Sequence, residues 1–393
     1  MANNNNKENK VANAPLLRFP EFKDEWEETF LNDCSDYISE RINTNKLSEE
    51  QYISTENMLQ NFYGVENSNN VPNNSNVISF LEQDILISNI RPYLKKIWLA
   101  NRNGGASTDV LVLRAKKNIE PSFLFYNLAN DNFINHVMAG CKGVKMPRGD
   151  KHQILTYKLG IPSSSEQSKI SDFLSLLDKR IELQKSAIEK LKSLMAGIRK
   201  YAQSLNSCKR TFLRDILTER KEKNSSLYPV YSVAVKEGLI DQIEHLGRSF
   251  AAKDTSNYHV VNEDDIVYTK SPTGEFPYGI VKKSFTNHSV AVSPLYGVYI
   301  AKNKDIATFL HYYFLSPTNT NNYLHCLIQK GAKNTINITN QHFLDNTIEL
   351  PDTEDLHKIV NGILAIQNKI EVESNTLKSY LDQKSYLLSK MFI

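Results

Sequence analysis

One long amphipathic pattern, from Pro162 to about Leu205, constrains the fold of this chain more than any other feature. It opens with Pro162-Ser163-Ser164-Ser165-Glu166. A serine three residues before a glutamate predicts a capping box, in which each side chain pairs with a free amide at a helix start. Apolar residues then recur at alternating steps of three and four, as in a helix that packs along a second helix. These seam residues are Ile170, Leu174, Leu177, Ile181, Ile188, Leu191, Met195, Ile198, Ala202 and Leu205, interrupted at Gln184.

The pattern occurs again 189 positions later, with Pro351 in the place of Pro162. Its seam residues are Ile359, Ile363, Ile366, Ile370, Leu377, Tyr380, Leu387 and Met391, with Glu373 at the position of Gln184 and Lys384 as a further interruption. A single helix of this kind is usually just part of a core. Two matched ones, each closing half of the chain, indicate an internal duplication.

The duplication also covers the segments before each helix, because Thr29-Phe30-Leu31 recurs as Thr211-Phe212-Leu213. Short apolar runs predict strands at 77–80, 85–87, 110–113 and 154–161 in the first copy, and at 265–268, 278–281, 289–300 and 346–350 in the second. Helices are expected from Pro121 through Val137 and from Ala307 to Leu315, where Pro317 should end the second one. The polar, Asn-rich stretch between Glu40 and Asn76 predicts loops.

The order along the chain is therefore domain, helix, domain, helix. We expect a disordered leader at 1–15, a first domain at 16–161, a first long helix at 162–206, a second domain at 207–350 and a second long helix at 351–393.

Composition excludes several classes of protein. The 393 residues suffice for two or three domains, and a net charge of +3 allows nucleic-acid binding only through local basic clusters. The four cysteines (Cys34, Cys141, Cys208, Cys326) lie far apart, so they predict neither a disulfide framework nor a zinc site and fit a reducing cytosol. The sequence contains no run of eighteen apolar residues, so it predicts no membrane span. The N-terminal residues lack the apolar stretch that a signal peptide needs. We expect a cytoplasmic protein.

The chain has almost no catalytic signature. Glycine-rich phosphate loops, His-Glu-x-x-His and the Asn-Pro-Pro-Tyr type of motif for amine methylation do not occur in the sequence. Glu219-Arg220-Lys221 resembles the end of a metal-dependent nuclease motif, but it stands in a charge run, for which a solvated surface is the favoured interpretation. We predict no catalytic and no metal-binding residues.

Local basic clusters are the remaining candidates for a binding site. They are Arg91, Lys95, Lys96 and Arg102, then Lys142, Lys145, Arg148 and Lys151, and in the second copy Lys270, Lys282, Lys283, Lys330 and Lys333, with Asn334 as a candidate adenine reader. Such side chains can neutralise phosphates or reach base edges in a groove. Any one of them alone is more often a plain surface charge, whereas clusters at equivalent points of both copies favour DNA binding. Trp98 and Tyr93, within the first cluster, are more often strand core than base-stacking platforms.

The chain resembles the specificity (S) subunit of type I restriction–modification systems. The resemblance covers nearly everything from about residue 16 to the end, and it rests on the order of the segments along the chain rather than on one motif. The matching segments are Leu17-Arg18-Phe19-Pro20-Glu21-Phe22, Ile90 to Lys96, Ser107-Thr108-Asp109, Val112-Leu113-Arg114, Ser293-Pro294-Leu295-Tyr296, and the helix start from Ile161 through Glu166-Gln167 to Ile170. The second helix start, from Leu350 to Ile359, lacks the Glu-Gln pair.

The resemblance implies an α+β fold, with two mixed α/β target-recognition domains in tandem repeat, separated by two long helices packed as an antiparallel coiled coil. Each domain would read half of a split, asymmetric target in double-stranded DNA, and the chain would be non-catalytic and bind no cofactor. It would dock two methyltransferase (M) subunits, which methylate adenine with S-adenosylmethionine, and restriction/translocase (R) subunits, with ATP and magnesium also on the partners.

The length of the long helices predicts how far apart the two halves of the DNA target lie. A seam of about 35 residues spans roughly 50 Å at about 1.5 Å per residue. Two domains held by such helices can meet grooves about one helical turn apart, near 34–36 Å. We therefore predict a two-part target with an unread gap of about half a turn to one turn.

Two other hypotheses stay open on the sequence alone. The chain could be a duplicated coiled-coil interaction scaffold that does not bind DNA, or an enzyme with an unfamiliar active site, such as a nuclease. A steep loss of DNA binding with added salt would separate the first from a DNA reader, and a metal-dependent cleavage assay would test the second.

Overall fold

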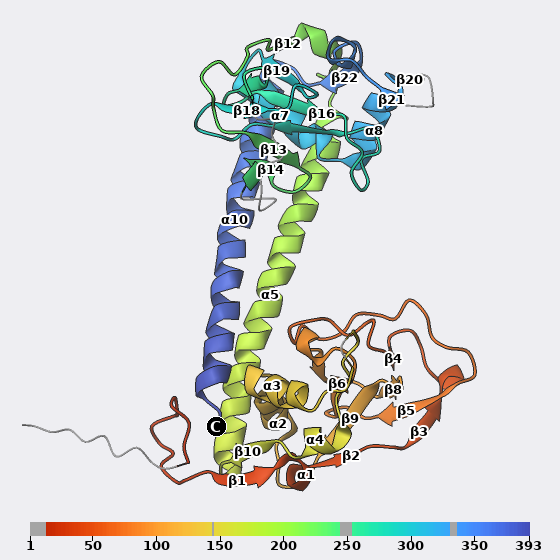
Figure 1. Cartoon of the computed structure of the whole chain (residues 1–393), viewed down its shortest axis with the longest axis vertical. Helices are drawn as coiled ribbons and strands as arrows, with labels where there is room; N and C mark the ends of the chain where they lie inside the picture. The colour runs from red at the N-terminus through yellow and green to blue at the C-terminus, as the bar shows by residue number, and fades with distance from the viewer. Residues whose placement is uncertain (1–12, 144, 244–253, 331–335) are drawn as a thin grey trace, which may run out of the picture. The chain divides into compact units, whose positions relative to one another are not determined.

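The structure is a computed structural model that describes residues 13–143, 145–243, 254–330 and 336–393, with the backbone alone at 329–330 and 336–337. Of the leader predicted at 1–15, residues 1–12 lie outside this description. Internal contacts divide the chain into two units, Met1–Ser186 with Ser374–Ile393, and Ala187–Glu373. We call them unit 1 and unit 2 and describe each by itself (Figure 1).

Among its described residues, unit 1 forms two four-stranded sheets. The first has the order β2 (Ser35–Tyr37), β9 (Val110–Ala115), β6 (Ile85–Ser88), β7 (Ile97–Leu99), and all its pairs are antiparallel. The second has the order β3 (Arg41–Asn43), β5 (Asn76–Phe80), β8 (Gly104–Ala106), β4 (Tyr52–Ile53), and its β4–β8 pair is parallel. A separate antiparallel pair joins β1 (Glu27–Phe30) to β10 (Lys158–Ile161), the strand that leads into the long helix.

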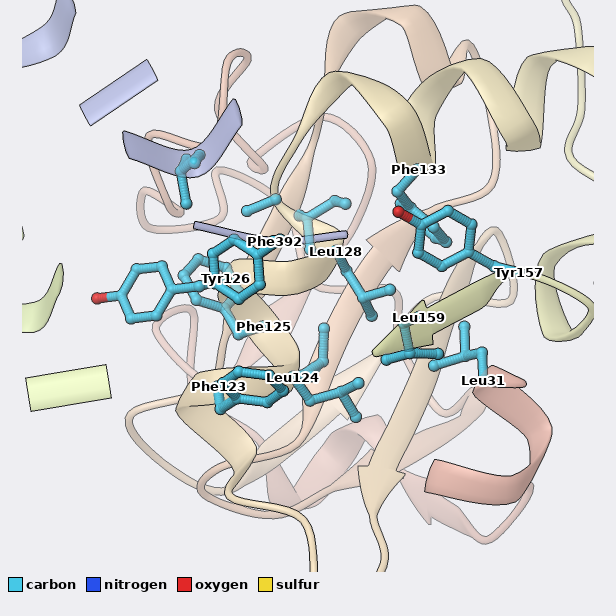
Figure 2. Close-up of a cluster of buried hydrophobic side chains, with 14 of the residues drawn as sticks. Leu31, Phe123, Leu124, Phe125, Tyr126, Leu128, Phe133, Tyr157, Leu159 and Phe392 are labelled. Atoms are coloured by element: carbon cyan, nitrogen blue, oxygen red, sulfur yellow. The ribbon is translucent and has the colours of Figure 1, made fainter. Parts of the chain in front are cut away.

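Helices cover the first sheet of unit 1 and close its core. They are α1 (Leu31–Cys34), α2 (Pro121–Leu128), α3 (Asp131–Ala139) and α4 (Lys151–Leu155), with the short 3-10 helices η1 (Thr44–Lys46) and η2 (Pro92–Leu94) in the loops. Every residue of α2 from Phe123 to Leu128 is buried, because this helix lies between the sheet and the ends of the long helices. Figure 2 shows its aromatic side chains in the core, where Phe123 and Phe392 lie 5.5 Å apart between ring centroids.

Unit 2 repeats the same plan. Its four-stranded antiparallel sheet has the order β12 (Leu217–Glu219), β19 (Gly297–Ala301), β16 (Ile266–Thr269), β17 (Ile280–Lys283), which matches the first sheet of unit 1 position by position. The pair β11 (Lys209–Phe212) and β22 (Thr347–Leu350) likewise matches β1 and β10. The remaining elements are η3 (Leu213–Asp215), the hairpin β13 (Tyr231–Ala234) with β14 (Gly238–Asp241), β15 (His259–Val261) with β18 (Val290–Val292), β20 (Gln329–Lys330) with β21 (Ile336–Asn337), α7 (Lys304–Phe314), α8 (Pro317–His325) and α9 (Asn340–Phe343).

The two predicted long helices are α5 (Ser164–Ala202) and α10 (Thr353–Lys390). In unit 1 the first half of α5 shares a core with the last turns of α10, through Leu174 and Leu387 among others. In unit 2 the last turns of α5 share a core with the first turns of α10, through Met195 and Ile363 among others. The start of each helix thus packs beside the end of the other, so they are antiparallel, and the predicted fold class is confirmed.

Burial follows the predicted seam. Of the predicted seam residues, Leu174, Leu177, Ile181, Ile188, Ile363 and Leu387 are buried. Leu191, Ile366, Ile370 and Leu377 are partly buried.

Several local predictions were wrong. The stretch from Glu40 to Asn76 contains β3, η1 and β4 rather than loops alone. The helix predicted from Pro121 through Val137 is two helices, because the Asn130 side chain accepts a hydrogen bond from Phe133 N and starts α3 afresh. Pro317 begins α8 instead of only ending α7, as proline does at a first helical position.

The predicted strand at 154–161 begins late, because residues 151–155 form α4 and only β10 is extended. The capping box at Ser163 is half formed. Ser163 Oγ accepts a hydrogen bond of 3.4 Å from Glu166 N, but the Glu166 carboxylate accepts from Arg18 instead of turning back to the helix start.

Candidate nucleic-acid interface

The basic turn of the first copy is a short hairpin between α3 and α4. Lys142 and Arg148 face each other in an antiparallel bridge, with N–H···O hydrogen bonds of 3.1 Å and 3.0 Å in the two directions. Gly143 adopts φ +92°, a left-handed conformation that glycine reaches without strain, and so lets the chain turn. The side chains of Lys142, Lys145, Arg148 and the following Lys151 are all exposed. We call residues 142–143 and 145–148 the basic hairpin.

The basic hairpin is anchored to the loop that carries Arg91. Arg91 N donates to Pro147 O at 2.8 Å, Gly149 N donates to Asn89 O at 3.0 Å, and Ile90 bridges to Arg148. Arg91 itself sits at φ +50°, which an arginine adopts only when its surroundings hold it there. The structure therefore brings exposed Arg91 together with the hairpin, although more than fifty residues separate them in sequence.

Acidic neighbours only partly neutralise this cluster. Lys142 pairs with Asp150 at 3.0 Å and Arg148 pairs with Asp109 at 3.1 Å, both near the surface. The hydrogen bond from Lys142, followed by those from two backbone amides, lowers the pKa of Asp150, which also caps α4. Surface ion pairs of this kind contribute only about 0–1 kcal/mol, so a phosphate can replace the carboxylate at little cost.

The other predicted cations of the first copy serve their own domain. Lys95 pairs with Asp131, and Lys96 Nζ donates to Thr55 O at 2.6 Å, where burial lowers its pKa. Arg102 donates to Glu50 O at 3.0 Å and lies 5.1 Å over the ring of Trp98. Trp98 is core, as expected, whereas Tyr93 is 48% exposed. Lys151 lies 4.3 Å over the Tyr37 ring beside the basic hairpin.

In the second copy β20 and β21 form the equivalent hairpin, and their pairing brackets residues 331–335. Lys333 and Asn334 lie outside the described residues, and of Lys330 only the backbone is described. Lys270 is half-buried, and burial lowers its pKa.

Lys282 and Lys283 are buried in β17, which argues against direct contact with a phosphate. Lys282 Nζ donates to Val235 O at 2.6 Å, and burial lowers its pKa to about 8. Lys283 Nζ pairs with Asp264 at 2.6 Å and donates to Thr308 Oγ1 at 3.2 Å. Neither ammonium group is presented to a ligand in this structure.

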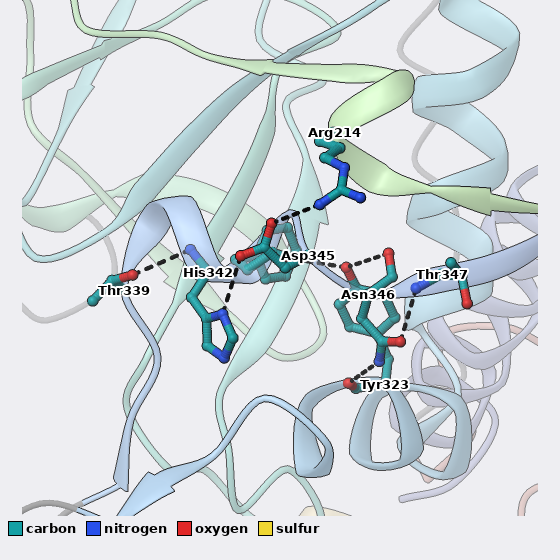
Figure 3. A network of polar contacts seen from close by, with 8 residues as sticks. Arg214, Tyr323, Thr339, His342, Asp345, Asn346 and Thr347 are labelled. Carbon is teal, nitrogen blue, oxygen red and sulfur yellow. Dashed lines mark hydrogen bonds and ion pairs between the residues drawn. The ribbon is translucent and has the colours of Figure 1, made fainter.

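A polar network that the sequence did not reveal surrounds α9, the short helix after the second hairpin (Figure 3). Asp345 joins Arg214 at 3.2 Å to His342 at 3.1 Å, and the amide of Asn346 donates to Tyr323 O at 2.8 Å. Thr339 Oγ1 accepts from His342 N and caps α9, as Asp150 caps α4 after the basic hairpin. Both copies thus carry a hairpin followed by a short helix with a side-chain N-cap.

The sequence leaves two chemical features to locate in the structure, a metal site and the nuclease-like segment Glu219-Arg220-Lys221. Within residues 13–143, 145–243, 254–330 and 336–393, no group of three or more His, Cys, Asp or Glu side chains could hold a metal. In Glu219-Arg220-Lys221, Arg220 binds buried Asp265 at 2.7 Å and Glu219 accepts from Asn340 Nδ2 at 2.9 Å, so both have structural partners. In the same described ranges, every helix is too short or too polar to cross a membrane.

Comparisons with known proteins agree on one family. The model of the type I restriction modification DNA specificity domain matches twice, at residues 23–193 and 206–381. The HindI type I restriction enzyme specificity subunit of Haemophilus influenzae is 28% identical over 168 residues, which cover 40% of this chain and 36% of that relative. The aligned part is therefore only about a third of that relative's length.

Solved structures share the fold. The S subunit of a type I restriction-modification system from M. genitalium gives a TM-score of 0.58 at 14% identity, covering 97% of this chain and 99% of that one. A chain from a study of complex assembly and conformational transition of the type I R-M system gives 0.53 at 15% identity, covering 93% and 97%. At such identities the likeness shows the fold alone.

Proposed function

Because the chain belongs to the type I restriction modification DNA specificity family, we propose that it reads a bipartite, asymmetric DNA target for a type I restriction–modification complex. In this role it is non-catalytic and acts by placing partner enzymes on their site. The duplicated topology of the two units carries the proposal, because a duplicated and diverged chain can read two different half-sites where a symmetric dimer reads a palindrome.

The equivalent hairpins supply the difference between the half-sites. Each follows the same helices and precedes a capped short helix, but the first is built on Lys142 and Arg148 and the second on Gln329-Lys330 and Ile336-Asn337. Phosphate contacts from exposed cations position a protein on the duplex, and longer side chains on turns reach base edges. Hairpins at equivalent positions with different residues fit two readers of unlike sequence.

The long helices set the spacing of the target in this proposal. The 39 residues of α5 correspond to roughly 58 Å at about 1.5 Å per residue, which exceeds one turn of DNA, near 34–36 Å. Shortening both helices by whole turns should therefore shorten the unread gap.

Partner docking is the second part of the proposal. The outer face of α5 exposes large apolar side chains along its length, namely Phe173, Leu176 and Leu183, then Leu194 and Tyr201. An exposed apolar stripe on a helix is typical of a protein-binding surface. We assign it to two methyltransferase subunits carrying S-adenosylmethionine, which restriction/translocase subunits with ATP and magnesium join in the cytoplasm.

Co-expression of this chain with a candidate type I methyltransferase subunit tests the proposal. The expected result is N6-methyladenine in the host DNA within a motif of two defined parts and an unread gap. An uninterrupted motif would contradict the two-part reading. In a gel-shift salt series on the assembled complex, binding should weaken steeply as salt rises, and no shift even at low salt would favour a scaffold that does not bind DNA.

A further inference from the structure

A charged contact joins α2, α5 and α10 inside unit 1. Asp178 on α5 accepts a hydrogen bond of 2.9 Å from Tyr126 Oη and one of 2.5 Å from Lys384 Nζ. Lys384 Nζ also lies 5.7 Å from the centre of the Tyr126 ring. The Lys384 side chain is 14% exposed and that of Asp178 is 32% exposed. We call Tyr126, Asp178 and Lys384 the partner-selecting contact.

The second copy does not repeat this contact. The shift of 189 residues that relates the copies places Gln367 where α5 has Asp178, and Met195 where α10 has Lys384. Met195 is buried in the core of unit 2, whereas Gln367 is exposed. The charge pair therefore exists in one copy only, and the duplicated helices are not interchangeable at this position.

This asymmetry determines which helices can pair. In the antiparallel pair, position 178 of α5 faces position 384 of α10. By the shift of 189 residues, position 384 of α10 is equivalent to position 195 of α5. Two α5 helices paired in that register would set Asp178 against Met195, and two α10 helices would set Lys384 against Gln367. Only the pairing of α5 with α10 satisfies both charges, and a charge left without its partner in a mostly apolar seam is costly.

We propose that the partner-selecting contact chooses the helix that packs on the first half of α5. The surface accepts a helix that presents a cation at this position, which its own α10 provides. Charge complementarity is the criterion, so the α10 helix of a second copy can take this place when the chain's own α10, which is favoured by its tether, carries the wrong charge. The proposal concerns helix pairing and does not depend on DNA binding.

Room beside the contact makes charge exchange feasible. A cavity of about 700 Å³ is lined by Tyr126, Asp178 and Lys384 together with residues of the loop 61–65. A longer side chain at position 178 can extend into this space without displacing core residues.

The test uses two full-length variants, Asp178→Lys and Lys384→Asp, carrying different tags. Each variant alone faces like charges in its own contact, so its unfolding midpoint should fall. Mixed in equal amounts and refolded from denaturant, the variants can satisfy both charges only between chains. Light scattering coupled to gel filtration should then show a dimer that contains both tags, while the same mixture of tagged wild-type chains shows no such species.

Two controls make the outcome decisive. The double variant Asp178→Lys/Lys384→Asp restores the pair within one chain, so it should recover most of the midpoint and stay out of mixed dimers. Asp172→Lys mixed with Lys378→Asp carries the same charge changes at exposed positions of the same helices and should give no mixed dimer. Unchanged midpoints without a mixed dimer, failure of the double variant to recover, or a mixed dimer from the control pair would each overturn the proposal.

Discussion

Arg18 holds Glu166 by two hydrogen bonds of 2.7 Å each, and their side chains are only 12% and 1% exposed. The pair ties the segment before β1 to the first turn of α5. In the second copy Ser207 donates to Asp355 at 2.6 Å, and both residues stand 189 positions after their counterparts. The first turn of the long helix is thus held by an ion pair in the first copy and by a hydroxyl–carboxylate hydrogen bond in the second.

Removing Arg18 should destabilise unit 1 strongly. In Arg18→Met the buried Glu166 carboxylate loses its partner, and breaking a buried ion pair from one side costs about 3–5 kcal/mol. Ser207→Ala is the matched change in unit 2 and should cost only about 1–3 kcal/mol, because it removes one hydrogen bond to a charged group. Urea denaturation measures both, and equal losses would refute the difference in chemistry.

Cations of the basic hairpin should set the salt dependence of DNA binding. If Lys145 and Arg148 each contact one phosphate, Lys145→Ala and Arg148→Ala should each reduce the slope of log affinity against log salt by about 1 in the assembled complex. Lys46→Ala, an exposed cation on η1, is the control and should leave the slope unchanged. If the slope were unchanged in all three variants, the basic hairpin would not be part of the DNA interface.

The sequence predicted the elements whose pattern is local and repeated. Seam positions such as Leu174 and Ile363 could be identified because helix packing imposes a period of about 3.5 residues that a single segment displays. The topology of the sheets was accessible only as a duplication, since strand order depends on pairing between distant segments.

The candidate site was less predictable, because partners decide the role of a lysine. Lys282 and Lys283 are adjacent on a strand, so they point to opposite faces. Both are buried because β17 is covered on both sides, by the hairpin loop at Val235 and by α7 at Thr308. From the sequence, Lys384 is only an interruption of the apolar seam, because its partner Asp178 lies 206 residues away and is identified only in the structure.

Unit 2 should lose stability below about pH 6.5 because of His311. This side chain is 9% exposed, and burial, followed by the charges of Lys282 and Lys283, lowers its pKa to about 3. Between about pH 6.5 and about pH 3 the unfolded chain binds a proton that the folded chain does not, so stability falls as pH falls. At pH 5 the loss should be about 2 kcal/mol, at roughly 1.4 kcal/mol per pH unit.

The variant His311→Asn should flatten this pH dependence, because its amide does not titrate and can still accept the hydrogen bond that Lys283 N donates to His311 Nδ1 at 3.2 Å. Its free energy of unfolding, measured from pH 7 to pH 4.5, is compared with that of His325→Asn, which changes an exposed histidine of α8. If both variants kept the wild-type slope, another group would be responsible.

Gly279 should tolerate no side chain, because two effects add at this position. It has φ +102°, and a Cβ there would lie 1.9 Å from Thr269 O, on the strand that pairs with β17. Gly238 has φ +79°, but among the described residues no atom lies within 4 Å of the point where a Cβ would stand. A substitution at Gly238 therefore measures backbone strain without steric overlap. Gly238→Ala should cost about 1–2 kcal/mol from strain alone, whereas Gly279→Ala should exceed about 4 kcal/mol, since relieving the overlap forces β16 and β17 apart. Thermal unfolding of the two variants measures the difference, and similar midpoints would mean that the β16–β17 turn yields more easily than its geometry indicates.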